Sequence, residues 1–131
     1  MFSFTISTKR QIELIDITDK VGEIVVKSGV KEGVCLVYVP HATAAIIINE
    51  FEPNIAQDYL EFFEKFVPKG PYKHNMIDDN AEAHMKSAFF GAGKCIPVSG
   101  GKIALGTWQS IILCEFDGPR TRTVHVQVAS C

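Results

Sequence analysis

Two apolar runs joined by a short link constrain the fold of this chain more than any other feature of its sequence. Residues 34–39 and residues 44–48 contain no charged side chain. Uninterrupted apolar runs of this length predict central strands that are buried on both faces of a sheet. Pro40 follows the first run and has no backbone N–H to donate to a ladder, so we expect the chain to bend there. The bend would place His41 and Thr43 at a strand end, beside a cleft.

Periodicity divides the rest of the chain into further strands and helices. Residues 2–6 alternate apolar and polar side chains, and residues 12–14 follow a Lys9-Arg10 turn, which predicts an antiparallel pair of half-buried strands. Helical spacing is present in three segments, Ile17 to Gly29, Pro53 to Pro68 and Asp79 to Gly91. Strand patterns return in residues 94–98, 102–114 and 121–129. The order ββαββααβββ predicts one α+β domain over residues 1–131, in which a largely antiparallel (mixed) sheet forms a sandwich or barrel with three helices.

Capping and turn residues predict where these elements begin and end. Asp16 or Thr18 can cap the first helix, and Asp79-Asn80-Ala81-Glu82 has the pattern of a capping box before the third. Ser99-Gly100-Gly101 is expected to form a hairpin turn, because glycine adopts positive φ at little cost. Asp117-Gly118-Pro119 is expected to join the last two strands.

Composition argues against several classes of protein. The 131 residues are 47% hydrophobic and 21% charged, as in a globular domain. A net charge of −2 without a basic stripe argues against a nucleic-acid partner. No apolar stretch approaches the roughly 20 residues of a membrane span, and the alternating N-terminus is unlike a secretory signal. The four cysteines form no C-x-x-C pair and three lie in apolar runs, so we expect buried free thiols in a cytoplasmic protein.

Three of the four histidines are candidates for a shared site. His41 follows the first apolar run, His74 lies in the polar loop 69–78, and His84 lies on the third predicted helix. Three neutral imidazoles are a familiar ligand set for zinc, with water or substrate in the fourth position. The alternative is that these histidines are scattered over the surface or satisfied in the core. His125 alternates with valines on the last strand and is expected to face solvent.

Charged and amide side chains at the ends of apolar segments could surround these histidines. Asn49 and Glu50 close the second apolar run, and Glu115 directly follows a third. A charge in such a place needs a partner or water. Arg120 and Arg122 stand two residues apart, and two guanidinium groups on one strand face suit a phosphate or carboxylate. An ion pair between Glu115 and one of the arginines is an equal alternative.

A glycine interrupts the strand predicted over residues 102–114. Gly106 indicates a bulge or a close backbone approach. Thr107 and Gln109 flank Trp108, whose ring could stack on a ligand next to the amide. A tryptophan in a strand belongs more often to the core, so both interpretations stay open.

Taken together, these segments resemble the YjbQ family of small proteins, also called the secondary thiamine-phosphate synthase family. The resemblance spans nearly the whole chain. Its His-x-Thr-Ala and Gly-Thr-Trp-Gln blocks are specific, because no generic strand requires them. The matching segments are Pro40 to Ala45 with Asn49-Glu50, His74 to Asp79 with His84 and Lys86-Ser87, Gly106 to Gln109, Glu115, and Asp117 to Arg122.

The resemblance implies an α+β protein, typically a homotrimer, in which His41, His74 and His84 are the metal or active-site set. The family's name implies a weak joining of a pyrimidine pyrophosphate to a thiazole phosphate, with loss of pyrophosphate, beside an undefined physiological activity. One departure is Ala42, where family members often carry Thr or Ser. Thr43 is therefore the expected substrate contact.

The leading hypothesis is a metal-dependent small-molecule enzyme that acts on phosphorylated metabolites. The three histidines would hold a divalent ion, which would be zinc, or magnesium with a phosphorylated substrate. Two alternatives stay open: a metal-dependent phosphate-ester hydrolase, and a non-catalytic metal- or metabolite-binding regulatory module. The other expected roles are catalytic for Glu50, Gln109 and Glu115, and substrate-binding for Thr43, Asn49, Thr107, Arg120 and Arg122.

Overall fold

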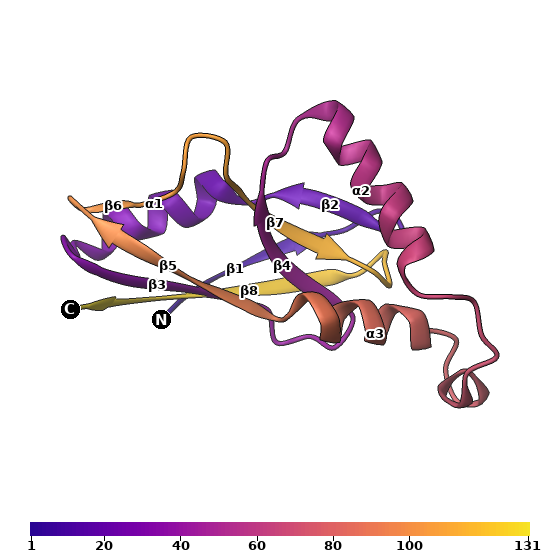
Figure 1. Cartoon of the computed structure of the whole chain (residues 1–131). Helices are drawn as coiled ribbons and strands as arrows, with labels where there is room; N and C mark the ends of the chain where they lie inside the picture. The colour runs from indigo at the N-terminus through magenta and orange to yellow at the C-terminus, as the bar shows by residue number, and fades with distance from the viewer.

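Eight strands divide between two antiparallel sheets that share one core. A computed structural model describes residues 1–131 (Figure 1). The five-stranded sheet has the order β1-β8-β3-β5-β6, and the three-stranded sheet has the order β2-β7-β4. The sheets curl into a half-barrel, which confirms the predicted α+β fold with three α-helices and antiparallel pairing. The strands are β1 (Phe2–Ser7), β2 (Glu13–Asp16), β3 (Gly33–Tyr38), β4 (Ala44–Asn49), β5 (Gly93–Ser99), β6 (Lys102–Ile103), β7 (Ser110–Glu115) and β8 (Thr121–Ser130). The helices are α1 (Thr18–Ser28), α2 (Pro53–Phe66) and α3 (Ala81–Phe90), with a 3₁₀ turn, η1 (Lys73–Met76), before α3.

The expected pairing of the first two strands is wrong. β1 pairs with β8, whereas β2 pairs with β7 in the other sheet. The link between β1 and β2 binds to the turn between β7 and β8 instead of closing a hairpin. In that link the Thr8 backbone N–H donates to the Arg120 carbonyl oxygen at 2.7 Å, and the Gly118 N–H donates to the Gln11 carbonyl oxygen at 3.0 Å. Contacts with the distant C-terminal strands therefore replace the local hairpin.

The two apolar runs form strands, but only the first is central. β3 lies between β8 and β5, while β4 is an edge strand. In β3 the side chains alternate, with Cys35 fully buried and Leu36 41% exposed. In β4 the first three residues are fully buried, because α3 packs on this strand. The continuous apolar pattern thus correctly predicted that β4 is buried. The burial comes from a covering helix and not from a central position in the sheet.

The helices largely occupy the predicted segments, with different caps. Gly29 ends α1 with φ of 74°, as the sequence predicts. Asp16 accepts the Thr18 N–H at 2.9 Å, one residue before the N-cap of α1. The predicted capping box of α3 is wrong, because Asn75 accepts the Ala81 N–H at 2.9 Å instead. The chain before α3 folds back as a 3₁₀ turn, which brings this more distant asparagine to the helix end.

The strand predicted over residues 102–114 is two strands separated by a protruding loop. β6 ends at Ile103 and β7 begins at Ser110 (Figure 1). Within the loop, Gln109 folds back on Gly106 through two hydrogen bonds of 2.8 and 3.0 Å. Trp108 is 74% exposed, so it is not a core residue of this chain.

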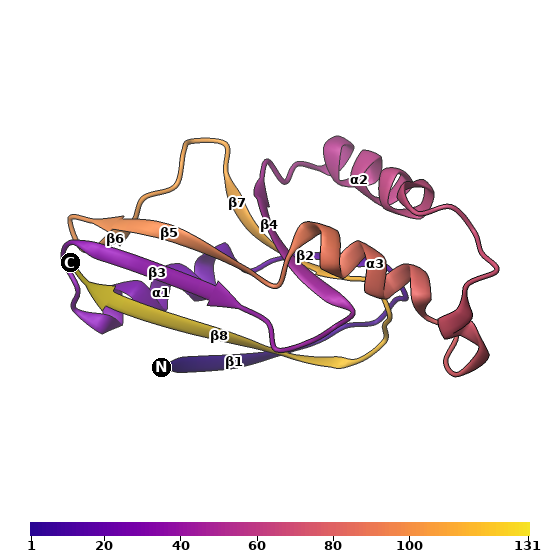
Figure 2. The same cartoon turned by 60° about the horizontal axis from the view of Figure 1, so that its bottom comes forward.

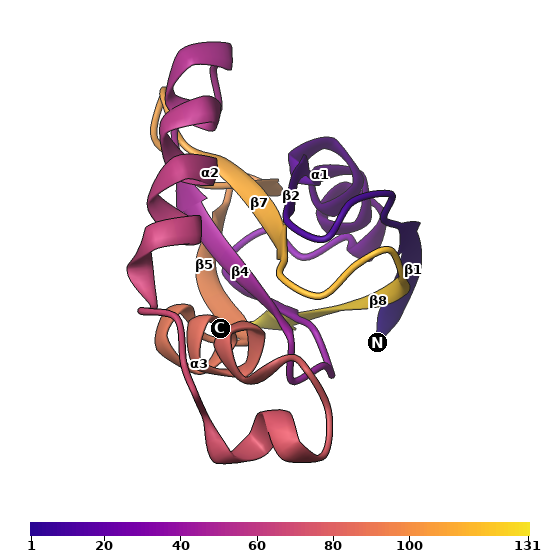
Figure 3. The same cartoon turned by 90° about the vertical axis from the view of Figure 1, so that its right-hand side faces the viewer.

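The helices cover the two sheets unequally. α2 and α3 lie on the side of β4, and α1 lies on the other side of the molecule (Figure 3). An apolar cluster around Val21, Val37 and Leu113 fills the space between α1 and the sheets, and an aromatic cluster around Phe63 and Phe116 lies under α2 and α3. Behind β3, β5 and β8, α1 packs on the inner face, and no helix covers the outer face (Figure 2). This leaves one face of the five-stranded sheet open.

The cysteines are all free, as expected, but the prediction that they are buried holds for only two of them. Cys35 and Cys114 are buried, whereas Cys95 and Cys131 are exposed, Cys95 because it lies on the outer face of β5. Burial raises the pKa of the Cys35 thiol to about 11, so this group stays protonated at neutral pH. None of the three α-helices is both long enough and apolar enough to cross a membrane.

Candidate functional site

Two of the three candidate histidines line one hollow. His41, which lies between β3 and β4, and His84, on α3, face a space of about 380 Å³. Ser87, one turn after His84, donates a buried hydrogen bond of 2.6 Å to the carbonyl oxygen of Ala44. This bond ties α3 to the start of β4 and so sets the spacing between the two imidazoles. The remaining walls are small side chains and backbone: Ala42, Ser87, Ala88, Gly91 and Ala92.

The third histidine lies beside the second. The ring centroids of His74 and His84 are 4.8 Å apart, with their planes at 76°. His84 therefore stands between the hollow, which it shares with His41, and the imidazole of His74. The chain contains no group of three or more His, Cys, Asp or Glu side chains that is close enough to hold a metal ion. The three histidines are thus neighbours in a row, and the single three-ligand cluster expected from the sequence is not assembled.

His41 is held by the backbone of β8. The Thr123 N–H donates to Nε2 of His41 at 2.9 Å. A backbone N–H can only donate, so Nε2 carries the lone pair and Nδ1 carries the proton when the ring is neutral. Burial first, and then the nearby Arg122 guanidinium, lower the pKa of His41. In this arrangement His41 is a hydrogen-bond donor, and its Nε2 is not available to a metal.

His74 is held by a chain of polar side chains. Its Nε2 lies 2.7 Å from Oδ1 of Asn80. Nδ2 of Asn80 donates to Asp117 at 2.9 Å, and Asp117 in turn binds the Arg120 guanidinium at 2.9 Å. Arg120 is therefore not beside Arg122 on one strand face, because the turn before β8 directs it to Asp117. Its side chain is 50% exposed, so it retains surface that can meet an anion.

Glu115 and Arg122 form a buried ion pair, which is the second of the two arrangements that the sequence allowed. Their side chains are 0% and 4% exposed. Nε of Arg122 donates to Glu115 at 2.9 Å, and its Nη2 donates to Oγ1 of Thr43 at 2.8 Å. Thr8 donates to the same carboxylate at 2.7 Å. Arg122 is thus not free for phosphate, nor Glu115 for proton transfer, and the pair instead fixes the backbone around His41.

Four of the expected site residues lie at the opposite end of the β4–β7 pair. Ala44 pairs with Glu115 at the histidine end, and Asn49 pairs with Ser110 at the other. The six residues of β4 separate these ends by roughly 17 Å at about 3.3 Å per residue. A single chain therefore does not bring them to the histidines. The residues concerned are Asn49, Glu50, Thr107 and Gln109.

Sequence reasoning missed several residues that organise the histidine end. Asn80 was assigned to a capping box and Asp117 to a turn, while Thr8 and Ser87 were given no role. Each of these polar side chains lies next to a residue that the sequence did identify as a site candidate: Asn80 next to His74, Asp117 next to Arg120, Thr8 next to Glu115 and Ser87 next to His84. The signal was weak, because the partner of each lies far away, as in the separation of 107 residues between Thr8 and Glu115.

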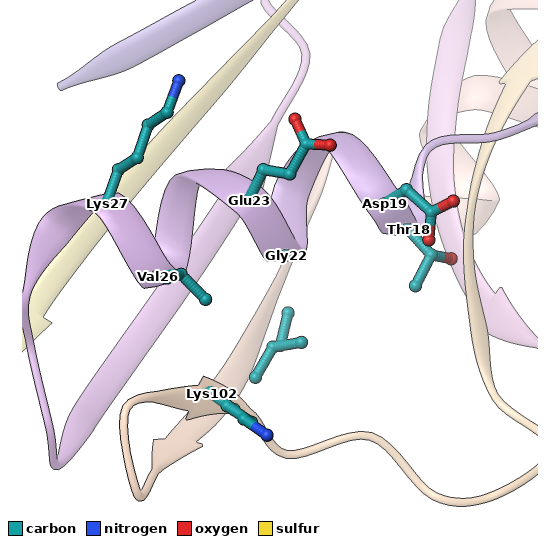
Figure 4. Close-up of a pocket in the computed structure, with 8 residues that line it drawn as sticks. Thr18, Asp19, Gly22, Glu23, Val26, Lys27 and Lys102 are labelled. Carbon is teal, nitrogen blue, oxygen red and sulfur yellow. The ribbon is translucent and has the colours of Figure 1, made fainter.

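The largest hollow of the molecule lies elsewhere. A space of about 660 Å³ lies between α1 and β6, with Gly22 and Val26 on the helix above Lys102 (Figure 4). Its charged side chains belong to both signs and lie at its rim. No histidine or cysteine lines it. Its ionisable groups are Asp19, Glu23, Lys27 and Lys102, with no imidazole among them, so the histidine end is the candidate functional site.

The fold and the site together define a class of protein: a small α+β half-barrel with a histidine-lined hollow at one end of its shorter sheet. The family model of UPF0047 YjbQ-like proteins matches residues 2–131, and the chain belongs to this family. A UPF0047 protein of Archaeoglobus fulgidus is 52% identical, over 94% of this chain and 96% of its own length. The UPF0047 protein YugU of Bacillus subtilis is 41% identical, over 94% of each chain.

Solved structures of similar proteins have the same fold. A YbjQ-like protein of unknown function from Sulfolobus solfataricus superposes with a TM-score of 0.96 at 48% identity, covering 99% of this chain and 96% of that one. A hypothetical protein from Aeropyrum pernix gives a TM-score of 0.95 at 44% identity, covering 99% and 98% of the two chains. The names of these relatives state no activity.

Proposed function

We propose that this chain is a small-molecule enzyme that acts on phosphorylated metabolites at the hollow between His41 and His84. One observation carries the proposal: the two imidazoles face one space, and a third, that of His74, adjoins them. Imidazole is the side chain best suited to move protons near neutral pH. The buried ion pair and threonines behind His41 hold it in one orientation, as a catalytic group requires.

In this proposal each polar group has a defined role toward a phosphate. The Nδ1–H of His41 donates to a phosphate oxygen, because its Nε2 is already bound to Thr123. The half-exposed Arg120 offsets the negative charge of the substrate. His84, whose imidazole makes no hydrogen bond within the chain, is free to exchange a proton with substrate. Thr43, which was expected to contact substrate, is buried and its hydroxyl accepts from Arg122, so its role is to hold the backbone next to His41.

A divalent metal ion, zinc or magnesium, belongs to the same proposal. His74 and His84 fit two nitrogen donors of such an ion, since their rings are adjacent and each has a nitrogen without a partner. His41 does not fit as a third donor to the ion, because its Nε2 already accepts a hydrogen bond from Thr123. When bound, the ion would supply positive charge to a phosphate oxygen or to water. Water or substrate would complete its coordination.

The type of reaction divides into two proposals. Thiamine-phosphate synthesis, a transfer with release of pyrophosphate, follows from the family resemblance. Phosphate-ester hydrolysis needs only water, a proton acceptor and charge neutralisation, which the histidine end provides. A non-catalytic metabolite-binding module is favoured by a separate observation, the distance between the histidines and Glu50, which was expected to be catalytic. Binding without turnover would identify that module.

We also propose that the chain works as a cytoplasmic homotrimer. Three exposed regions support self-association. Phe89 on α3 is 70% exposed, Trp108 between β6 and β7 is 74% exposed, and the uncovered outer face of β3, β5 and β8 contains no Lys, Arg, Asp or Glu and exposes Leu36 and Tyr38. Large exposed apolar patches are unusual on monomers. Assembly could also bring Asn49, Glu50, Thr107 and Gln109 of one copy to the histidines of another.

The function is tested with His84→Ala and the control variant Lys27→Ala. Lys27 is exposed in the last turn of α1, away from the histidines and from the outer sheet face. A panel of phosphorylated metabolites is incubated with each protein, and released phosphate and pyrophosphate are followed by ³¹P NMR. We expect about 100-fold or greater loss of turnover for His84→Ala and little change for Lys27→Ala. Equal activity of all three proteins would contradict the proposal, and bound but unaltered ligand would favour the non-catalytic module.

Metal content is tested on the same proteins. Elemental analysis after purification is expected to find a divalent ion in wild type and less of it in His84→Ala. Equal uptake by both proteins would exclude His84 as a ligand.

A further inference from the structure

We propose that Asn80 is a positioning residue that holds His74 in the Nε2–H tautomer, opposite to the tautomer of His41. The site then contains one histidine with a free N–H and one with a free lone pair. Only the consequence of this role for catalysis rests on the proposed function. The tautomer itself follows from hydrogen-bond chemistry.

The orientation of the Asn80 amide is determined by Asp117. A carboxylate only accepts hydrogen bonds, so the NH₂ group of Asn80 must face Asp117, 2.9 Å away. The amide oxygen is thereby directed to Nε2 of His74, at 2.7 Å. An amide oxygen also only accepts, so the proton between them belongs to His74 Nε2. The neutral ring then has its lone pair on Nδ1.

The carboxylate that sets this order accepts two hydrogen bonds on one oxygen, and the Asp117 backbone is anchored as well. The Arg120 guanidinium donates to its Oδ2 at 2.9 Å, the same oxygen that Asn80 binds. The Asp117 backbone N–H donates to Glu115 at 3.0 Å, which connects the turn to the buried ion pair. Asn80 is only 9% exposed, so water competes little for its amide. The bonds therefore converge on Asp117: Arg120 donates to it from one side, and on the other side Asn80 donates to it and accepts from His74.

Asn80 has no other role that would explain its side chain. It occupies the N-cap of α3, yet its side chain makes no cap hydrogen bond. That bond is made by Asn75, whose Oδ1 accepts the Ala81 N–H at 2.9 Å. The two asparagines thus have separate roles: Asn75 caps α3, and Asn80 orients His74.

The consequence for the site is a pair of complementary histidines. His41 offers Nδ1–H to an anionic oxygen in the hollow, and His74 offers the lone pair of its Nδ1 beside His84, to the proposed metal ion or to a water. A phosphate bound at His41, with a metal ion or an attacking water held near His74 and His84, would use both groups.

The tautomers can be read directly by long-range ¹H–¹⁵N NMR at about pH 8, where an ordinary imidazole is neutral. In the wild-type protein we expect His41 as the Nδ1–H form and His74 as the Nε2–H form, with a His74 ring proton that exchanges slowly with water. Finding His74 protonated on Nδ1 would overturn the proposal, whatever the activity of the protein.

Three variants separate positioning from helix capping. In Asn80→Ala the His74 ring proton is expected to exchange with water at least 10-fold faster. In Asn75→Ala, which removes the cap but not the bond to His74, exchange should stay as in wild type; a similar acceleration there would show that helix fraying is the cause and refute positioning by Asn80. The charge-conserving swap Asn80→Asp with Asp117→Asn restores an acceptor next to His74, so slow exchange should return. Failure of the swap to restore slow exchange would contradict the proposed chain of bonds.

Discussion

The buried pair of Glu115 and Arg122 is the residue-scale feature with the largest effect on stability. Each charge is compensated by the other and by Thr8 or Thr43. Removing one partner leaves the other buried without compensation, which costs about 3–5 kcal/mol. We therefore expect Arg122→Met to lower the free energy of unfolding by that amount, measured by urea denaturation.

The double variant Glu115→Leu with Arg122→Met provides the control. It removes both charges, so it should be more stable than Arg122→Met alone. A single variant as stable as wild type would mean that the pair is solvated and that the geometry described here is wrong. Neither variant tests catalysis, because the pair acts by holding the backbone behind His41.

At this scale, the sequence predicted residue types better than partners. His41 and His84 were identified because a histidine after an apolar strand or on a polar helix face is conspicuous. Whether Arg122 would meet Glu115 or a phosphate depended on which way one side chain turns. The pattern of β8 allowed both, and only the position of β7 decides between them.

At the scale of elements, two glycines should respond to the same substitution in opposite directions. A Cβ on Gly22, in the middle of α1, would meet nothing within 4 Å, whereas a Cβ on Gly118 would lie 2.1 Å from the Arg10 carbonyl oxygen. Gly22→Ala should stabilise the protein by about 0.5–1 kcal/mol through helix propensity. Gly118→Ala should destabilise it by roughly 2 kcal/mol or more, because the turn must open.

Thermal and urea unfolding of the two variants measure this contrast. The second substitution should also disturb the neighbouring histidine end, visible as altered NMR signals of His74. If Gly118→Ala were neutral, the close approach between the β7–β8 turn and the first link of the chain would be refuted.

Elements with local signals were predictable and their partners were not. Spacing, Pro53 and Gly29 located the α-helices within a few residues, because those signals act within one turn. The β1–β2 hairpin failed because strand pairing is decided by non-local competition. The long strand over residues 102–114 failed because Gln109 bonds to its own loop, which no alternation of side chains reveals.

At the scale of the whole molecule, the open sheet face predicts assembly. Leu36 is 41% exposed on the outer face of β3, so a lysine there can reach water without unfolding the chain. If the wild type is the proposed homotrimer, we expect Leu36→Lys to fold but to have a lower mass than wild type in light scattering. The matched change Val26→Lys, at a residue of α1 that is 62% exposed, should leave the mass unchanged. A monomeric wild type would refute the homotrimer.

The candidate site was predictable as a set of residues but not as one place. Sequence reasoning gathered all the polar residues at strand ends into a single pocket. The structure divides them between two ends of the β4–β7 pair, because antiparallel strands present their polar termini in opposite directions. The sequence pattern alone does not say at which end of the β4–β7 pair each polar residue lies.

The polar chain around the histidines also determines when the histidine end can form during synthesis of the protein. Its bonds connect Thr8 with Glu115, His41 with Thr123 and Thr43 with Arg122, across 107, 82 and 79 residues. Each requires closure of a loop that spans most of the chain, and the entropy of that closure is lost before the contact forms. A nascent chain therefore holds no organised histidine end until β8 has left the ribosome, and folding should be slow for a protein of this length.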